Sequence, residues 1–192
     1  INLDSFQGWY SHAGTPKLIV RRQVGNDPNQ MTLVFLQHLP DTAAKTSKAT
    51  LPIPVRIAFL DDSGAIVPTK LLENSAELEE HVVLLEDDQQ ELSIFASDAQ
   101  NLIPSILRNF SAPIILDDDL SDDERIHIFM FDDDFFNRWD NAQILVTKEI
   151  LAIANDPLET LNNARVEILA EAFSTVIKDS SCPDHFKAAI LT

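Results

Sequence analysis

The spacing of the hydrophobic residues changes near residue 120, and this change divides the chain into two parts. Before it, apolar residues mostly alternate with polar ones, which is the period of a strand with one buried face. After it, they recur every three or four residues, which is the period of an amphipathic helix. We therefore predict an all-β domain over residues 1–118 and a helical segment over residues 119–192.

About eight short apolar runs in the first part are predicted to be strands, because turn residues such as Gly, Asn, Asp and Pro separate them. These runs are residues 17–24, 30–38, 53–59, 65–68, 81–86, 91–96, 105–110 and 113–116. Short strands at such regular spacing favour a two-layer antiparallel sandwich. In the run 53–59 the apolar residues share one face, and Pro54 indicates a strand at a sheet edge.

The start of the chain carries three aromatic residues, Phe6, Trp9 and Tyr10, which are spaced like one face of a short helical turn. Gly14 and Pro16 would end that turn. We interpret this segment as the tail of a preceding element. The first residue is Ile rather than Met, so we expect the chain to be a piece of a longer protein.

Capping signals mark the helices predicted for the second part. Ser121 with Glu124 forms a capping box, and Asp156-Pro157 precedes Glu159 in the same way. The apolar stripes of the two long helices consist of Phe135, Trp139, Ala142, Val146, Ile150 and Ile153, and of Leu158, Leu161, Ile168, Ala172 and Val176. We expect such helices to pack in antiparallel pairs. A third helix, starting at Cys182-Pro183, has no following partner.

Charge and composition exclude several classes of partner. The chain holds 14 basic and 31 acidic residues and has a formal net charge of −17, which opposes binding to a phosphate backbone. No apolar run approaches the roughly 20 residues that a membrane-spanning helix needs. We expect neither nucleic acid nor a membrane as a partner. The single Cys182 cannot form an internal disulfide and fits a reducing compartment.

The histidines do not form the pattern of a zinc peptidase, which places two imidazoles and a glutamate on one helical face as His-Glu-x-x-His. They are widely separated, and we interpret each as an exposed or singly bonded surface residue. They are His12, His38, His81, His127 and His185.

Acidic residues gather in three clusters, at 117–119, 122–124 and 132–134. None of them can be aligned with an EF-hand loop, because the required glycine and final glutamate are missing. We predict instead that these carboxylates cap helix N-termini, where the helix dipole favours negative charge. An adventitious cation is the alternative.

The remaining candidate groups have structural interpretations. Cys182 is predicted at a helix start but has only His185 nearby in sequence as a base, so we interpret it as structural. Arg138 follows Asp134 by four residues, the spacing of a helical ion pair. Asn109-Phe110-Ser111 matches a glycosylation acceptor only formally. We therefore assign no catalytic, cofactor-binding or metal-binding residue to this chain.

Several sequence blocks resemble bacterial aminopeptidase N, the zinc alanyl aminopeptidase of the gluzincin type. They occur in one order along nearly the whole chain. The blocks are Phe6-x-x-Trp9-Tyr10-x-x-x-Gly14-Thr15-Pro16, Phe110-Ser111-Ala112-Pro113, Phe136-x-Arg138-Trp139-Asp140-x-x-Gln143 and Ala189-Ile190-Leu191-Thr192.

The resemblance implies that this chain is the immunoglobulin-like sandwich, the third domain of such an enzyme, followed by the first helices of its C-terminal superhelix. Residues 6–10 would then lead out of the catalytic domain. That domain, absent here, would bind the zinc and the peptide substrates, and the enzyme would be cytoplasmic. The chain itself would be an inactive spacer that supports the helical lid, with the catalytic and remaining helical domains as its partners.

Two other functions are compatible with the residues. The first is an independent sandwich with helical repeats that binds a protein partner. The second is a calcium-stabilised, adhesin-like module. Neither depends on the resemblance.

Overall fold

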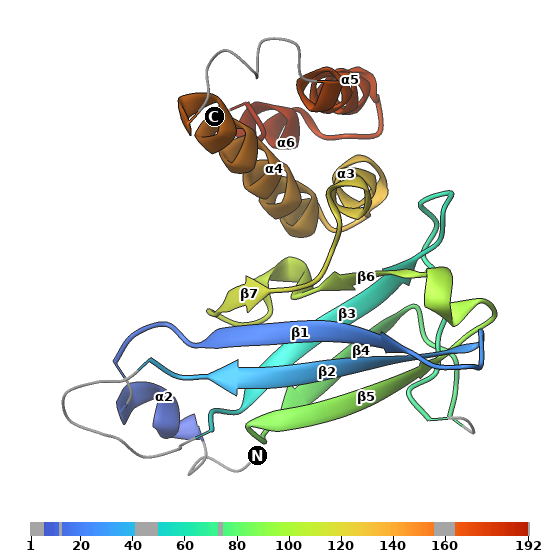
Figure 1. Cartoon of the computed structure of the whole chain (residues 1–192), viewed down its shortest axis with the longest axis vertical. Coiled ribbons are helices and arrows are strands. Elements are labelled where there is room, and N and C mark those ends of the chain that lie inside the picture. Colours follow the sequence, from blue (N-terminus) through green and yellow to red (C-terminus); the bar gives the residue numbers. More distant parts are fainter. Residues whose placement is uncertain (1–5, 12, 41–49, 73–74, 156–163, 192) are drawn as a thin grey trace. The chain divides into compact units, whose positions relative to one another are not determined.

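The computed structural model describes residues 6–11, 13–40, 50–72, 75–155 and 164–191, and it divides into two compact units (Figure 1). One unit is a β-sandwich that contains Ile1–Asp62 and Ile66–Asp119. The other is helical and contains Leu120–Thr192 together with the turn Ser63–Ala65. The predicted change from strands to helices near residue 120 is confirmed.

The larger sheet has the strand order β5-β2-β1-β7 and forms the front layer of the sandwich in Figure 1. Its strands are β1 (Lys17–Val24), β2 (Gln30–His38), β5 (Gln89–Phe95) and β7 (Ile115–Asp117). β1 and β5 pair with β2 in antiparallel fashion, but β7 runs parallel to β1. The predicted two-layer sandwich is present, but its predicted antiparallel pairing is wrong for β7. The strand before β7 in the chain is β6 of the smaller sheet, so the chain crosses between the sheets to reach β7 and forms no hairpin there.

The smaller sheet has the order β4-β3-β6, with β3 (Ile53–Leu60) between β4 (Glu80–Leu85) and β6 (Ile103–Ile106). The prediction that β3 is an edge strand is wrong. β6 pairs with β3 only from Ile57 to Leu60, so the pairing on that side begins beyond Pro54. Pro54 is tolerated in this central strand because β3 is paired only with β4 at that position. Its missing N–H therefore removes no bond to β6.

Two predicted strands differ from the structure. In the run 65–68 only Ile66 forms a bridge, to Leu60. The run 105–110 is strand only up to Ile106, because the following residues turn into a 3-10 helix, η2 (Arg108–Phe110). Leu107, Asn109 and Phe110 have φ angles of 64°, 54° and 48°. These angles lie in the left-handed region, which residues other than glycine rarely adopt.

The core of the sandwich is the space between the two sheets, and the period of two in the sequence produces it. Every second residue of β3 is fully buried, which confirms the predicted shared face. The opposing sheet contributes Leu18, Val20, Met31, Leu33 and Phe35 to the same cluster. Each such side chain contributes roughly 1.5–3 kcal/mol by leaving water.

The aromatic segment at the start of the chain forms the predicted helical turn, α2 (Gly8–Ser11). Trp9 anchors it, because its indole Nε1 donates a hydrogen bond of 3.1 Å to the carbonyl of Pro52. A Cβ atom at Gly8 would lie only 2.8 Å from a Leu51 methyl carbon, so the close approach of this turn favours glycine. Phe6 and Tyr10 pack edge to face with their ring centroids 6.2 Å apart.

His81 on β4 is a buried polar residue of the sandwich, with only 4% of its surface exposed. The expectation of a surface histidine is wrong here, because the alternation of β4 turns position 81 inward. Its Nε2 lies 2.9 Å from the Thr69 hydroxyl and 3.1 Å from the Thr69 carbonyl oxygen. Burial lowers the pKa of His81 below its usual value, although the bond to the Thr69 carbonyl acts in the opposite direction.

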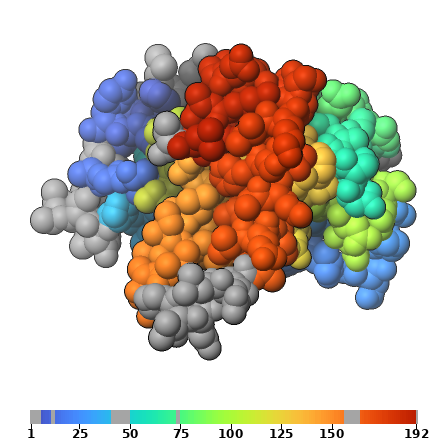
Figure 2. Space-filling view, turned by 90° about the horizontal axis from the view of Figure 1, so that it is seen from above, coloured from blue at the N-terminus to red at the C-terminus, as the bar shows by residue number. Residues whose placement is uncertain are grey.

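The described part of the helical unit contains α3 (Asp122–Phe131), α4 (Phe135–Asn155), α5 (Ala164–Lys178) and α6 (Asp184–Ala189). Figure 2 looks onto this unit, where the surface of α4 adjoins that of α5 and α6. The capping box of Ser121 and Glu124 is present at the start of α3, as predicted. The cap predicted at Asp156-Pro157, together with Leu158 and Leu161, lies outside the described residues.

The predicted apolar stripe of α4 is only partly buried, and its Ala142 lies fully in the core. Ile150 and Ile153 of that stripe are exposed, whereas Arg138, Asn141 and Leu145 are buried. Part of the buried face is polar, since Asn141 accepts a hydrogen bond of 2.9 Å from Arg125 of α3. The residues of this unit's core cluster are Phe129, Ala142, Ala172, Val176, Cys182, Phe186 and Ile190.

Arg138 joins three elements of the helical unit. Its guanidinium donates to the carbonyl oxygens of Phe129, at 2.8 Å, and Met130, at 2.9 Å, near the C-terminus of α3. It also lies over the Phe186 ring of α6, 5.0 Å from the centroid. The structural interpretation of Arg138 holds, but its side chain bonds to these carbonyls rather than to the predicted partner Asp134, which instead caps α4 by accepting from the amide of Asn137.

Replacing Arg138 with Met should destabilise the helical unit by roughly 2–4 kcal/mol, because two carbonyl oxygens lose a charged donor in a buried site. Lys148→Met is the matched control. The ion pair of Lys148 with Asp122 is exposed, so its loss should cost less than about 1 kcal/mol. Urea unfolding followed by far-ultraviolet circular dichroism measures both. Equal losses in the two variants would contradict the role assigned to Arg138.

The sandwich should lose stability as the pH falls from 7 towards 5.5, partly through His81. The unfolded ring gains a proton near its usual pKa of 6.5, whereas the folded ring stays neutral to lower pH, so protonation favours unfolding. In His81→Gln this pH dependence should be smaller, and in the exposed-site control His38→Gln it should match the wild type. Urea midpoints at each pH test this. A His81 pKa at or above 6.5 by NMR would refute it.

Candidate functional site

The other histidines are dispersed over the described part of the chain. His38 and His185 are exposed, in agreement with the sequence analysis. His127 is half-buried on α3 and its ring packs 4.9 Å from the ring of Phe131. His12 lies outside the described residues.

The first acidic cluster does not cap a helix, so the prediction is wrong for Asp117 and Asp119. Asp117 is paired with Lys17 at 2.5 Å and with Arg21 at 2.8 Å, and these two cations, Lys17 first, lower the pKa of its carboxyl group. Asp119 accepts from the side chain and the amide of Arg22. These pairs connect β1 with the end of the sandwich at β7.

The second and third clusters do lie at helix starts, as predicted. Asp122, Asp123 and Glu124 occupy the first turn of α3. Asp132 and Asp134 accept from backbone amides ahead of α4 and in its first turn. Negative groups in these positions offset the positive end of the helix dipole.

No three His, Cys, Asp or Glu side chains gather within the described ranges in a way that could hold a metal ion. The sequence-based assignment of no metal, cofactor or catalytic residue stays a prediction. Within the described ranges, no helix has both the length and the apolar character to cross a membrane.

Cys182 is a core residue of the helical unit and not a reactive thiol at an open surface. It is buried, and its Sγ lies 3.3 Å from a carboxylate oxygen of Asp179. Hydrogen bonds from the hydroxyl and amide of Ser181, followed by that of the Cys182 thiol, lower the pKa of Asp179. His185 is exposed. Sequence proximity had made it the one candidate base.

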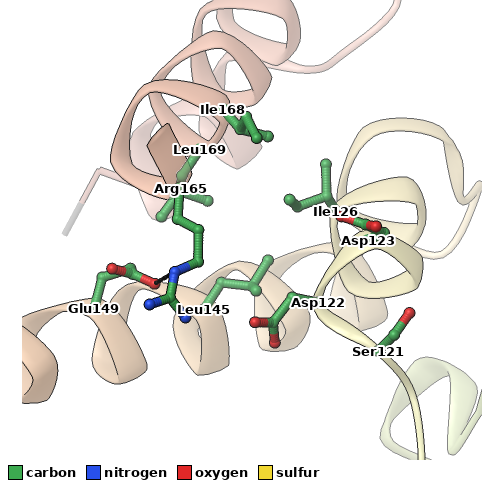
Figure 3. Close-up of a pocket in the computed structure, with 9 residues that line it drawn as sticks. All are labelled: Ser121, Asp122, Asp123, Ile126, Leu145, Glu149, Arg165, Ile168 and Leu169. Carbon is green, nitrogen blue, oxygen red and sulfur yellow. Dashed lines mark ion pairs between the residues drawn. The ribbon is translucent and has the colours of Figure 1, made fainter. Parts of the chain in front are cut away.

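A pocket of about 280 Å³ lies among α3, α4 and α5 (Figure 3). Leu145 and Ile126 form part of its apolar wall. Arg165 extends across it towards Glu149, and the two charged groups are 3.8 Å apart. Asp122 at its mouth is paired with Lys148. Three of the charged groups that line this pocket, those of Asp122, Glu149 and Arg165, already have ionic partners within the protein. This indicates a structural groove and not an assembled reaction site.

One polar constellation was missed in the sequence analysis. Glu80 at the start of β4 accepts from Arg56 of β3, with Nε at 2.9 Å, and from Nε of Arg108 at 3.1 Å. The Arg108 side chain is only 6% exposed. The three residues are far apart in sequence, and only the outward direction of Arg56 on its strand was a signal. The trio joins β3, β4 and η2.

Comparison with known families gives two matches along the chain. Residues 14–119 match the family described as "Domain of unknown function (DUF3458) Ig-like fold". Residues 122–192 match the family described as "Domain of unknown function (DUF3458_C) ARM repeats". The Ig-like family covers the sandwich, and the ARM-repeat family covers the helices.

The chain is also similar in sequence to parts of two bacterial aminopeptidases. The chain is 31% identical over 150 residues to aminopeptidase N of Haemophilus influenzae, covering 78% of this chain and 17% of that protein. It is 29% identical over 193 residues to aminopeptidase N of Escherichia coli, covering 100% of this chain and 22% of that protein. It therefore spans about a fifth of the length of these relatives.

A solved structure shares the fold. The chain superimposes on the crystal structure of Legionella pneumophila aminopeptidase A in complex with aspartic acid with a TM-score of 0.75 and 23% sequence identity. The match covers 100% of this chain and 20% of that chain. The Ig-like sandwich followed by helices, predicted from sequence, is confirmed. Since the Ig-like family matches more than half of the chain, this chain belongs to the DUF3458 family and is homologous to a part of aminopeptidase N.

Proposed function

We propose that this chain is a non-catalytic part of a zinc-dependent aminopeptidase, an enzyme that removes N-terminal residues from peptides. The observation that carries the proposal is the match to aminopeptidase N along the whole chain, at 29% identity over 193 residues. The match includes both modules, the sandwich and the helices, and amounts to 22% of that relative. The catalytic work would belong to the remaining parts of the parent enzyme, which acts in the cytoplasm.

The described residues of this chain do not fit a zinc site. A catalytic zinc needs three protein ligands from His, Asp, Glu or Cys with an open fourth position. The described residues bring no such set together, and the whole sequence has no His-Glu-x-x-His pattern. The zinc of the parent enzyme would therefore be held by residues outside this chain, and no catalytic step is assigned to the chain.

The role left to this segment is mechanical. Residues 1–118 would be a rigid spacer, since the ion pairs of Asp117 and the trio around Glu80 reinforce its two sheets. Residues 119–192 would be the first helices of a lid that helps to enclose the substrate chamber. α2 would be the segment that leads out of the catalytic domain. The partners would be the catalytic and remaining helical domains of the same polypeptide.

The purified chain should bind less than stoichiometric zinc and should not hydrolyse an aminoacyl arylamide, because it lacks the ligands and the general base. Zinc content by elemental analysis and release of the arylamine measure these two properties. Reproducible turnover, or one tightly bound zinc per chain, would refute the proposal.

A transplant distinguishes a spacer of an aminopeptidase from an unrelated binding module. This chain should replace the matching segment of Escherichia coli aminopeptidase N and leave a folded hydrolase that retains its zinc. The control is the same enzyme with that segment deleted, which should be inactive. A soluble, zinc-loaded chimera no more active than the deletion would favour the alternative, an independent protein-binding module.

A further inference from the structure

Two exposed apolar side chains lie next to each other on the outer face of the smaller sheet. On the larger sheet, Gln23, Thr32 and Ser93 are neighbours in the strand register, so that row is polar. On the smaller sheet, Val82 and Leu84 of β4 point outward and are 68% and 49% exposed. An outward face of an antiparallel sheet normally carries polar residues. The apolar side chains of β4 therefore call for an explanation other than the sandwich core.

The outer face of β3 beside Val82 and Leu84 carries both an apolar and a charged residue. Leu84 lies opposite Pro54, and Val82 lies opposite Arg56, in the register of β4 and β3. On the other side of β3, the amide of Arg56 donates to the Ser111 hydroxyl at 3.1 Å, which places Phe110 beside the same strand. Phe110 is 52% exposed. We call Pro54, Val82, Leu84 and Phe110 the β4 patch.

The backbone around Phe110 is held in an unfavourable conformation. Leu107, Asn109 and Phe110 have positive φ angles, and two of these residues are bulky. The buried side chain of Arg108, bonded to Glu80, fixes this segment to β4. Strain of this kind persists where the surrounding structure imposes it, and here it accompanies a phenylalanine presented to solvent.

We infer that the β4 patch is the surface through which the sandwich docks against the catalytic domain of the parent enzyme, an inference that rests on the proposed function. A second copy is a poor occupant, because two chains of formal charge −17 repel each other. A domain of the same polypeptide is held nearby by its covalent connection and needs only a modest apolar contact.

The position of α2 supports this occupant. Trp9 bonds to Pro52, two residues before Pro54, so α2 lies at the same end of β3 as part of the β4 patch. α2 also carries the exposed rings of Phe6 and Tyr10. In the proposed enzyme α2 follows the catalytic domain. The catalytic domain is thereby tethered at the end of β3 that carries Pro54 of the β4 patch.

Cysteine labelling tests the inference. Val82→Cys is prepared in the 192-residue chain and in the full-length enzyme that contains it, and modification by a maleimide is timed. The native Cys182 is buried and gives little background. We expect modification of position 82 to be at least about tenfold slower in the full-length enzyme, since interface cores exclude solvent. Val24→Cys, at an apolar site that is 60% exposed on β1, is the matched control and should react equally in both proteins.

Hydrolysis of an alanyl arylamide by the same full-length preparation separates the two claims. An active enzyme in which position 82 reacts as fast as in the 192-residue chain would overturn the docking surface and leave the proposed function intact. A full-length protein without zinc or activity would overturn the proposed function itself. Slow, concentration-dependent labelling of the 192-residue chain alone would identify a second copy as the occupant and also overturn the inference.

Discussion

The sandwich depends on the burial of one face of each sheet against the other. β3 contributes four fully buried residues to this contact, Ile53, Val55, Ile57 and Phe59. The larger sheet contributes buried residues of β1 and β2. A shift of one residue in any of these strands would turn its whole apolar set to solvent, so the register is strongly specified.

The helical unit also buries an apolar cluster, but polar residues occupy part of the buried face of α4. The apolar stripe of α4 predicts that Ile150 and Ile153 face inward, yet both are exposed. Arg138 and Asn141 of the same helix are buried. Arg138 satisfies carbonyl oxygens at the end of α3 that have no partner within their own helix. Periodicity alone treats such residues as solvent-facing, because it contains no information about the ends of neighbouring helices.

Sequence periodicity and turn chemistry therefore predict where the helices and strands lie in the sequence better than they predict which elements pack against each other. The strands 17–24 and 30–38 have the predicted bounds, and the capping box at Ser121 is present. The parallel pairing of β7, the central position of β3 and the inward direction of His81 depend on contacts between distant residues, which spacing does not encode. The trio of Arg56, Glu80 and Arg108 is hidden for the same reason. Functional assignment came from ordered sequence blocks and not from any cluster of reactive groups.

The parallel pairing of β7 with β1 has a consequence for biosynthesis. The two strands meet at residues that are distant in sequence, as the bond from Arg21 to the Asp117 carbonyl shows, since the partners are 96 positions apart. Such a contact closes a long loop, which slows folding and delays it until both partners exist. On the ribosome, the larger sheet would remain incomplete until residue 117 has emerged from the exit tunnel. The nascent sandwich would thus pass through a period with an open β1 edge, a state in which unpaired strands invite association with other chains.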